Sequence, residues 1–125
     1  MIIAIDFDGT CVYHDYPYIG KDIGAVPVLK ELVAAGHQLI LFTMRDGKLL
    51  KEAEAWFKEN KIPLIGSNLN KEQSRWTSSP KVHADLYIDD SALGTPLKYE
   101  IDLPRPYVDW EKTRQMLLDF GLIEE

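Results

Sequence analysis

Two carboxylates, Asp6 and Asp8, are separated by a single residue and come just after an apolar run at the start of the chain. This run, residues 1–5, is rich in β-branched side chains and predicts a buried strand. In an extended chain, residues two apart project from the same face, so both carboxylates should point to one side. Acids at the end of a buried strand are costly unless a cation meets them. The pair therefore predicts a cation nearby.

Polar residues follow two later apolar segments in the same way. Thr43 comes after segment 38–42, and Asp89 and Asp90 come after segment 84–88. Parallel strands present their carboxyl ends at one edge of a sheet, where open α/β sheets bind ligands. We therefore expect four carboxylates and a hydroxyl to converge there. The alternative is a set of exposed strand ends that holds no ligand.

The predicted cluster offers hard oxygen ligands with no cysteine or histidine, a set that suits Mg²⁺. Magnesium often binds through a few carboxylates together with a substrate phosphate, so the cluster predicts a phosphate as well. A carboxylate can also act as the nucleophile and form an aspartyl-phosphate. Asp6 adjoins the strand and is the candidate nucleophile. Asp8 would protonate the leaving group and later take a proton from the attacking water.

The transferred phosphoryl group also needs hydrogen-bond donors and a positive charge. Thr43 can donate to a phosphoryl oxygen, and Gly9 lets a ligand come close to the backbone. A lysine would neutralise the negative charge of the group. Lys81, just before the last apolar segment, is the first candidate for this role, and Lys71 is the second.

The spacing of apolar residues predicts strands that alternate with helices. This alternation favours an α/β fold with a mainly parallel sheet and helices on both faces. Residues 11–24 show no long period and predict a loop or short hairpin that forms a flap. The expected strands cover 1–5, 38–42, 62–65 and 84–88, with a short edge strand near 99–101, and the expected helices cover 26–35, 48–60 and 108–120.

In this order, the sequence DFDGT after an apolar strand, Thr43, a lysine and the final Asp89-Asp90 pair resemble the haloacid dehalogenase (HAD) superfamily of phosphatases. The resemblance covers residues 2–94. It implies a three-layer, Rossmann-like sheet with the first strand in the centre. It also implies that Asp6 is nucleophile and metal ligand, and that Asp8 is the acid/base and touches the metal through its backbone carbonyl. Asp90 would be the more direct Mg²⁺ ligand, and Asp89 a ligand or an orienting group.

The spacings from Asp8 to Thr43 and from Thr43 to Lys81 leave room for a helix and short loops only. Neither cap domain of the superfamily fits, so the resemblance implies one capless domain over residues 1–125. Many relatives place the lysine well before the final acids, a spacing that Lys71 fits better than Lys81. An open site implies a large substrate, or a cover formed by the flap or by a second copy in a homo-oligomer.

The composition agrees with one soluble globular domain of 125 residues, with 46% hydrophobic and 27% charged residues. A net charge of −6 argues against binding to duplex nucleic acid, which needs a basic face. The single cysteine, Cys11, cannot form an internal disulfide and fits a reducing cytoplasm. No apolar stretch is long enough to span a bilayer, so we expect no membrane contact.

The function predicted from these residues is a Mg²⁺-dependent phosphomonoester hydrolase that acts on a phosphorylated small molecule. One alternative is a phosphatase for nucleic-acid ends, which an open site would admit. Another is a receiver-like domain that is phosphorylated as a switch and is not an enzyme. A receiver carries its phosphorylated aspartate at the end of a middle strand, whereas the middle strands here end in Thr43 and near Gly66.

Overall fold

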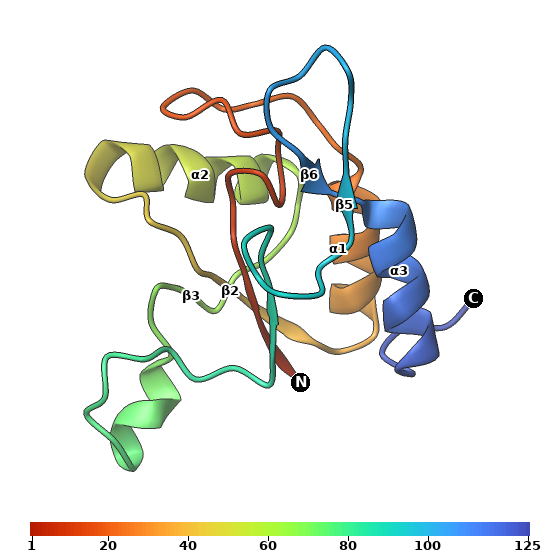
Figure 1. Ribbon diagram of the computed structural model, residues 1–125. Coiled ribbons are helices and arrows are strands. Elements are labelled where there is room, and N and C mark those ends of the chain that lie inside the picture. The colour runs from red at the N-terminus through yellow and green to blue at the C-terminus, as the bar shows by residue number, and fades with distance from the viewer.

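The computed structural model describes all residues, 1–125, and has an α/β architecture built on one parallel sheet (Figure 1). The sheet contains β1 (Ile2–Ile5), β2 (Gln38–Leu41), β3 (Gly66–Ser67) and β4 (Leu86–Ile88) in the order β3-β2-β1-β4. All three pairings are parallel, and Ile5 lies opposite both Leu41 and Ile88. The residues that follow β1, β2 and β4 therefore emerge side by side, as the sequence predicts.

Three α-helices accompany the sheet: α1 (Ala25–Ala34), α2 (Gly47–Glu59) and α3 (Trp110–Asp119). α1 and α3 lie next to each other, and the Arg114 guanidinium donates to both carboxylate oxygens of Glu31 at 2.8 and 2.9 Å (Figure 1). None of the helices combines the length and the hydropathy that crossing a membrane requires.

One face of the sheet carries the main hydrophobic core. Side chains alternate between the faces of a strand, and Ile3, Ile5, Leu39 and Leu41 share the cluster to which all three α-helices contribute. On α2, the rings of Trp56 and Phe57 pack against Phe7, which follows β1, with centroids 5.6 and 6.2 Å away. β1 is thus an interior strand whose end is held by the core.

The other face, which carries Ala4 and Ile40, is buried without being part of that cluster. Tyr87, which pairs with Ala4, lies on this face, and its hydroxyl donates to the carbonyl of Val82 at 2.6 Å. The chain from β3 to β4 therefore covers this face. This connection is rich in serine, asparagine and proline, which disfavour helix interiors, and its one helical segment is the short 3-10 helix η1 (Lys71–Arg75).

The element bounds agree with the sequence-based prediction except at two places. β3 begins later than expected, because Pro63 has no N–H to donate to the ladder and the first bond to β2 comes from Ile65 N to Leu39 O at 2.8 Å. The prediction of an edge strand near 99–101 is wrong. Instead, β5 (Leu97–Lys98) and β6 (Tyr107–Val108) form a separate antiparallel pair, and residues 99–106 are the loop between them.

Two contacts attach the C-terminal part of the chain to the loop after β1. Val108 N donates to Gly9 O at 3.0 Å, and the indole Nε1 of Trp110 donates to Thr10 O at 2.7 Å. In Figure 1, the loop between β5 and β6 therefore lies at the same end of the molecule as the flap, residues 11–24. Within the flap, Tyr13 N donates to Lys21 O at 2.9 Å. Both segments stand over the carboxyl ends of the strands.

Candidate active site

Three of the four predicted carboxylates meet at the carboxyl ends of β1 and β4. Asp6, Asp89 and Asp90 each place a carboxylate oxygen within 4.8 Å of the other two. The neighbouring strands β1 and β4 bring them together because Ile5 and Ile88 are in register. The three side chains are half-buried, so the cluster is open to a ligand on one side.

A buried hydroxyl, that of Thr10, holds two members of this cluster in place. Thr10 Oγ1 donates to Asp6 Oδ2 at 2.8 Å and accepts the backbone N–H of Asp90 at 3.0 Å. Thr10 is fully buried, so these bonds are shielded from water. The sequence analysis gave Thr10 no role. Its position four residues after Asp6, beyond a glycine turn, is the signal that could have revealed it.

Gly9 makes room for the cluster. Its backbone φ is +82°, and a Cβ atom at this position would lie 2.3 Å from Asp90 Oδ2. Its N–H donates to Val12 O at 2.8 Å inside the flap. The Gly9 N–H is thus already used, and a role of Gly9 in binding phosphate stays a prediction. The absent side chain allows the Asp90 carboxylate to reach the strand ends.

Burial and crowding oppose ionisation of this cluster in the absence of a cation. Burial, followed by the charge of Asp89, raises the pKa of Asp6 to about 8. Burial, with a smaller contribution from Asp90, also raises the pKa of Asp89. A cation between the carboxylates would reverse both effects. The donor set is all oxygen and the Gly9 gap gives it space, so the three aspartates fit a hard divalent cation such as Mg²⁺.

The fourth predicted carboxylate, Asp8, lies outside the metal cluster and pairs with an arginine. Arg45 donates through Nε to Asp8 Oδ2 and through Nη2 to Asp8 Oδ1, both at 2.8 Å. The Arg45 side chain has no exposed surface, and 12% of the Asp8 side chain is exposed. The Asp8 carboxylate is therefore not placed as a metal ligand. A two-point ion pair of this kind holds it in one orientation.

Arg45 also connects the flap to the site. Its guanidinium donates to the carbonyls of Pro17 at 3.3 Å and Tyr18 at 2.8 Å, both in the flap. The same group lies 5.0 Å from the centre of the Phe7 ring and 5.2 Å from that of the Tyr16 ring. The ion pair with Asp8 raises the pKa of Arg45, so the group stays charged. Sequence reasoning missed this contact, which joins segments far apart in the chain.

A cleft of about 440 Å³ opens over these residues. Its floor holds the aspartates, and Thr43 lies beside them at the end of β2. Thr43 Oγ1 accepts the N–H of Arg45 at 3.1 Å, which leaves its own proton free to donate to a ligand. His14 and Tyr16 from the flap and Arg105 from the loop between β5 and β6 also line the cleft. Tyr16 and Arg105 are exposed, whereas the aspartates are half-buried, so we call the loop residues the rim of the cleft.

Neither predicted phosphate-binding lysine lines this cleft. Lys81 precedes β4, so it lies toward the amino end of a strand whose carboxyl end forms the site, and it is exposed. Lys71 belongs to η1, which Figure 1 shows at the far end from the flap, and it lines a separate hollow there. The lysine assignment is therefore wrong for both residues. The cations that line the cleft are Arg45 and Arg105.

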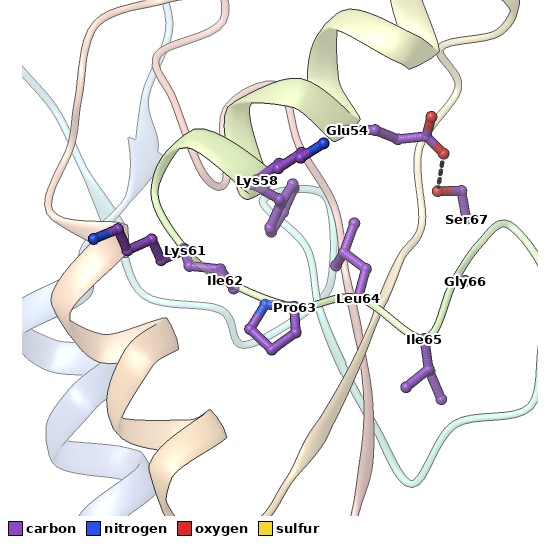
Figure 2. Close-up of a pocket in the computed structure, with 10 residues that line it drawn as sticks. Glu54, Lys58, Lys61, Ile62, Pro63, Leu64, Ile65, Gly66 and Ser67 are labelled. Carbon is purple, nitrogen blue, oxygen red and sulfur yellow. Dashed lines mark hydrogen bonds between the residues drawn. The ribbon is translucent and has the colours of Figure 1, made fainter.

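A larger hollow of about 580 Å³ lies away from the acidic cluster, between the end of α2 and β3 (Figure 2). Its walls include Ile62, Pro63 and Leu64, and its one acid, Glu54, accepts a hydrogen bond from Ser67 Oγ at 2.6 Å. None of the residues that line the acidic cleft lines this hollow. The chemistry of the chain is therefore concentrated in the smaller, acidic cleft.

Comparison with known proteins identifies one related structure and no described family. No family model matches the sequence, and no curated protein matches it either. A solved structure, that of a conserved protein from Bacteroides thetaiotaomicron, is 36% identical, with a TM-score of 0.77 over 96% of this chain and 91% of that chain. The chain belongs to the same family as that protein. That protein is described only as conserved, so the activity is argued from the cleft.

Proposed function

We propose that the chain is a Mg²⁺-dependent phosphomonoester hydrolase of the HAD type, a capless single domain with a three-layer, Rossmann-like fold. The observation that carries the proposal is the convergence of Asp6, Asp89 and Asp90 within 4.8 Å at the ends of β1 and β4. Buried Thr10, which bonds to Asp6 and Asp90, makes this convergence a fixed arrangement rather than a chance meeting of surface acids.

In this proposal, Asp6, Asp89 and Asp90 hold the Mg²⁺, which supplies positive charge beside the phosphoryl group. Asp6 attacks through a carboxylate oxygen, a bond forms between that oxygen and phosphorus, and the bond from phosphorus to the ester oxygen breaks. The leaving oxygen takes a proton from Asp8. Water then gives a proton to Asp8, attacks phosphorus and displaces Asp6, which releases inorganic phosphate and restores the carboxylate.

The ion pair between Asp8 and Arg45 suits the second step, the attack of water, better than the first step, the departure of the leaving group. The two-point contact with the guanidinium fixes the orientation of the Asp8 carboxylate, which lines the cleft as an acceptor for the proton of the attacking water. As the acid of the first step, Asp8 must hold a proton, so the pair has to loosen before the leaving group departs. We infer that a bound substrate loosens it, because the pair lines the cleft that the substrate enters.

The substrate in this proposal is a phosphorylated small molecule. A cleft of about 440 Å³ accommodates a ligand of that size. His14 and Tyr16 of the flap line the cleft and supply part of the cover that a cap domain or a second copy would otherwise provide. Thr43 donates to a phosphoryl oxygen, the role that its free hydroxyl proton supports.

Phosphate release is the direct test. The purified chain is incubated with sugar phosphates, nucleotides, p-nitrophenyl phosphate and a 5′-phosphorylated oligonucleotide, with Mg²⁺ or with a chelator. Release from the small esters with Mg²⁺ alone is expected. Release from the oligonucleotide alone would favour the nucleic-acid end phosphatase, and a stable phosphorylated chain without turnover would favour the receiver-like switch. No release and no phosphorylation with any compound would remove the proposal.

A further inference from the structure

The flap and the loop between β5 and β6 are joined to each other above the cleft. Arg105 N donates to the hydroxyl of Tyr13 at 3.3 Å, and the rings of Tyr13 and Tyr107 meet edge to face with centroids 6.1 Å apart. Lys21 Nζ lies 3.5 Å from a carboxylate oxygen of Glu100. Segments about 90 residues apart in sequence, such as those of Tyr13 and Arg105, therefore form one unit at the mouth of the cleft.

At the mouth of the cleft, this rim unit presents a cation, Arg105, and an aromatic ring, that of Tyr16, to a ligand. Arg105 lines the cleft, is exposed, and makes no ion pair with any carboxylate. Tyr16 is half-exposed and its ring is held by the guanidinium of Arg45. Arg45 is itself occupied by Asp8, so Arg105 is the free cation of the cleft.

The location of Arg105 separates it from the phosphoryl group. A phosphoryl group attacked by Asp6 lies on the floor, at the strand ends, beside Thr43. Arg105 comes from a loop outside the sheet and stands with His14 and Tyr16 at the rim. The part of a substrate that reaches the rim is the part beyond the scissile bond, which leaves with the ester oxygen.

We propose that Arg105 is a specificity-determining residue that binds an anionic group, a carboxylate or a second phosphate, on the leaving part of the substrate. The proposal rests on the proposed hydrolase function. It narrows the substrate to a phosphate ester whose leaving group carries its own negative charge. Such a group needs a local cation, because the cleft walls are acidic and the whole chain has a net charge of −6.

The test compares two esters that differ in one charge, phenyl phosphate and 4-carboxyphenyl phosphate, with the wild-type chain and with Arg105→Gln. The wild type should have the higher kcat/KM on the carboxylated ester, and Arg105→Gln should lose this preference by about tenfold, the scale of one charged contact. The kcat/KM on phenyl phosphate, which has no second anionic group, should fall much less than that on the carboxylated ester. Arg105→Lys, which keeps the charge, should retain part of the preference, and added salt should weaken it.

Lys81→Gln is the matched control, because it removes an exposed cation outside the cleft and should change neither rate. Equal hydrolysis of the two esters by the wild type would overturn the role of Arg105 and leave the hydrolase proposal intact. An equal loss on both esters in Arg105→Gln would also overturn it, by placing Arg105 on the phosphoryl group. Hydrolysis of neither ester, with none in the broader screen, would remove the hydrolase proposal itself.

Discussion

At the scale of single residues, the cleft depends on two neighbours that carry no charge. Gly9 leaves the space that the Asp90 carboxylate fills, and Thr10 bonds to Asp6 and Asp90 at once. Each has a matched control elsewhere in the chain: Gly94 has a similar backbone φ but open space around it, and Thr113 has a buried hydroxyl without a hydrogen-bond partner. Comparing each residue with its control separates effects on the backbone or on burial from effects on the site.

Gly9→Ala should weaken Mg²⁺ binding strongly, because its Cβ would meet Asp90 Oδ2 at 2.3 Å. Gly94→Ala is the control, since Gly94 has a similar φ of +89° with nothing within 4 Å of its Cβ position. Both variants should lose about 1–2 kcal/mol of stability from the left-handed backbone. Titration calorimetry with Mg²⁺ should show a loss of affinity in Gly9→Ala alone. Equal affinities in the two variants would show that Gly9 does not make room for the site.

Thr10→Val should destabilise the fold by about 1–3 kcal/mol, because it leaves the buried Asp90 N–H without an acceptor and Asp6 without a donor. Thr113→Val is the matched control, since the buried hydroxyl of Thr113 has no hydrogen-bond partner and its loss should be neutral or stabilising. Urea unfolding measures both changes. A Thr10→Val variant as stable as the wild type would contradict the role of Thr10.

The stability of the metal-free chain should fall as pH rises from about 4 to about 8. The pKa of Asp6 is raised to about 8 in the fold, chiefly by burial, whereas an aspartate in the unfolded chain ionises near pH 4 (about 3.9). Between these values the native state binds more protons than the unfolded state, so the free energy of unfolding decreases with pH. The raised pKa of Asp89 acts in the same direction.

Thermal unfolding with a chelator, at several values between about pH 5 and pH 8, measures this dependence. Asp6→Asn cannot ionise and should flatten it. Mg²⁺ should stabilise the wild type more at the upper end of the range, where the carboxylates are ready to bind it. If Asp6→Asn and the wild type lost stability equally over this range, the buried Asp6 carboxyl would not be the source.

At the scale of elements, Arg45 links the end of β2 to the flap. It is buried and bonds to Asp8 and to the carbonyls of Pro17 and Tyr18. Lysine at this position keeps a charge but cannot reproduce the planar fork that meets Asp8 at two points. Replacing Arg45 by lysine should therefore detach the flap from the cleft although the positive charge is kept.

Arg45→Lys should destabilise the chain by roughly 1–3 kcal/mol, the scale of leaving buried acceptors without their donors. It should also raise amide hydrogen exchange in residues 11–24 above that of the wild type, since the Pro17 and Tyr18 carbonyls lose their donors. Arg114→Lys is the control, because the pair of Arg114 with Glu31 is about one-third exposed and joins α1 to α3. Unchanged exchange in the flap of Arg45→Lys would contradict the link.

The elements themselves could largely be predicted from the sequence. β1, β2 and β4 are short apolar segments, and the helices show apolar residues at helical spacing, so their order and the parallel sheet followed. The meeting of Asp6 with Asp89 and Asp90 could be predicted because parallel strands align their carboxyl ends. The choice of Lys81 overlooked the direction of β4. Lys81 precedes this strand, so it lies toward the amino end, whereas the site lies at the carboxyl end.

Other parts of the site depend on contacts that no local pattern encodes. The Arg45–Asp8 pair joins residues 37 positions apart, and the Arg45 guanidinium is also held by the flap carbonyls of Pro17 and Tyr18. Arg105 reaches the cleft only because Val108 bonds to Gly9 and positions the β5–β6 pair there. In sequence, Arg105 is simply a residue between two prolines in a connecting segment.

At the scale of the whole molecule, the start of α3 meets the loop after β1 beside the cleft. Trp110, the first residue of α3, bonds through its indole to the carbonyl of Thr10, and Thr10 in turn holds Asp6 and Asp90. The C-terminal helix therefore supports the loop that follows the N-terminal strand. This support would hold Asp6 still during the phosphorylation that we propose for it.

The measurement that tests this account most directly is intact-mass spectrometry of acid-quenched chain taken during turnover of a small phosphate ester in Mg²⁺. The account predicts one transient phosphate on the wild-type chain, mapped to the peptide that contains Asp6, and none on Asp6→Asn, which should keep its fold but lose turnover. Turnover by Asp6→Asn, or a phosphate on any other residue, would contradict it.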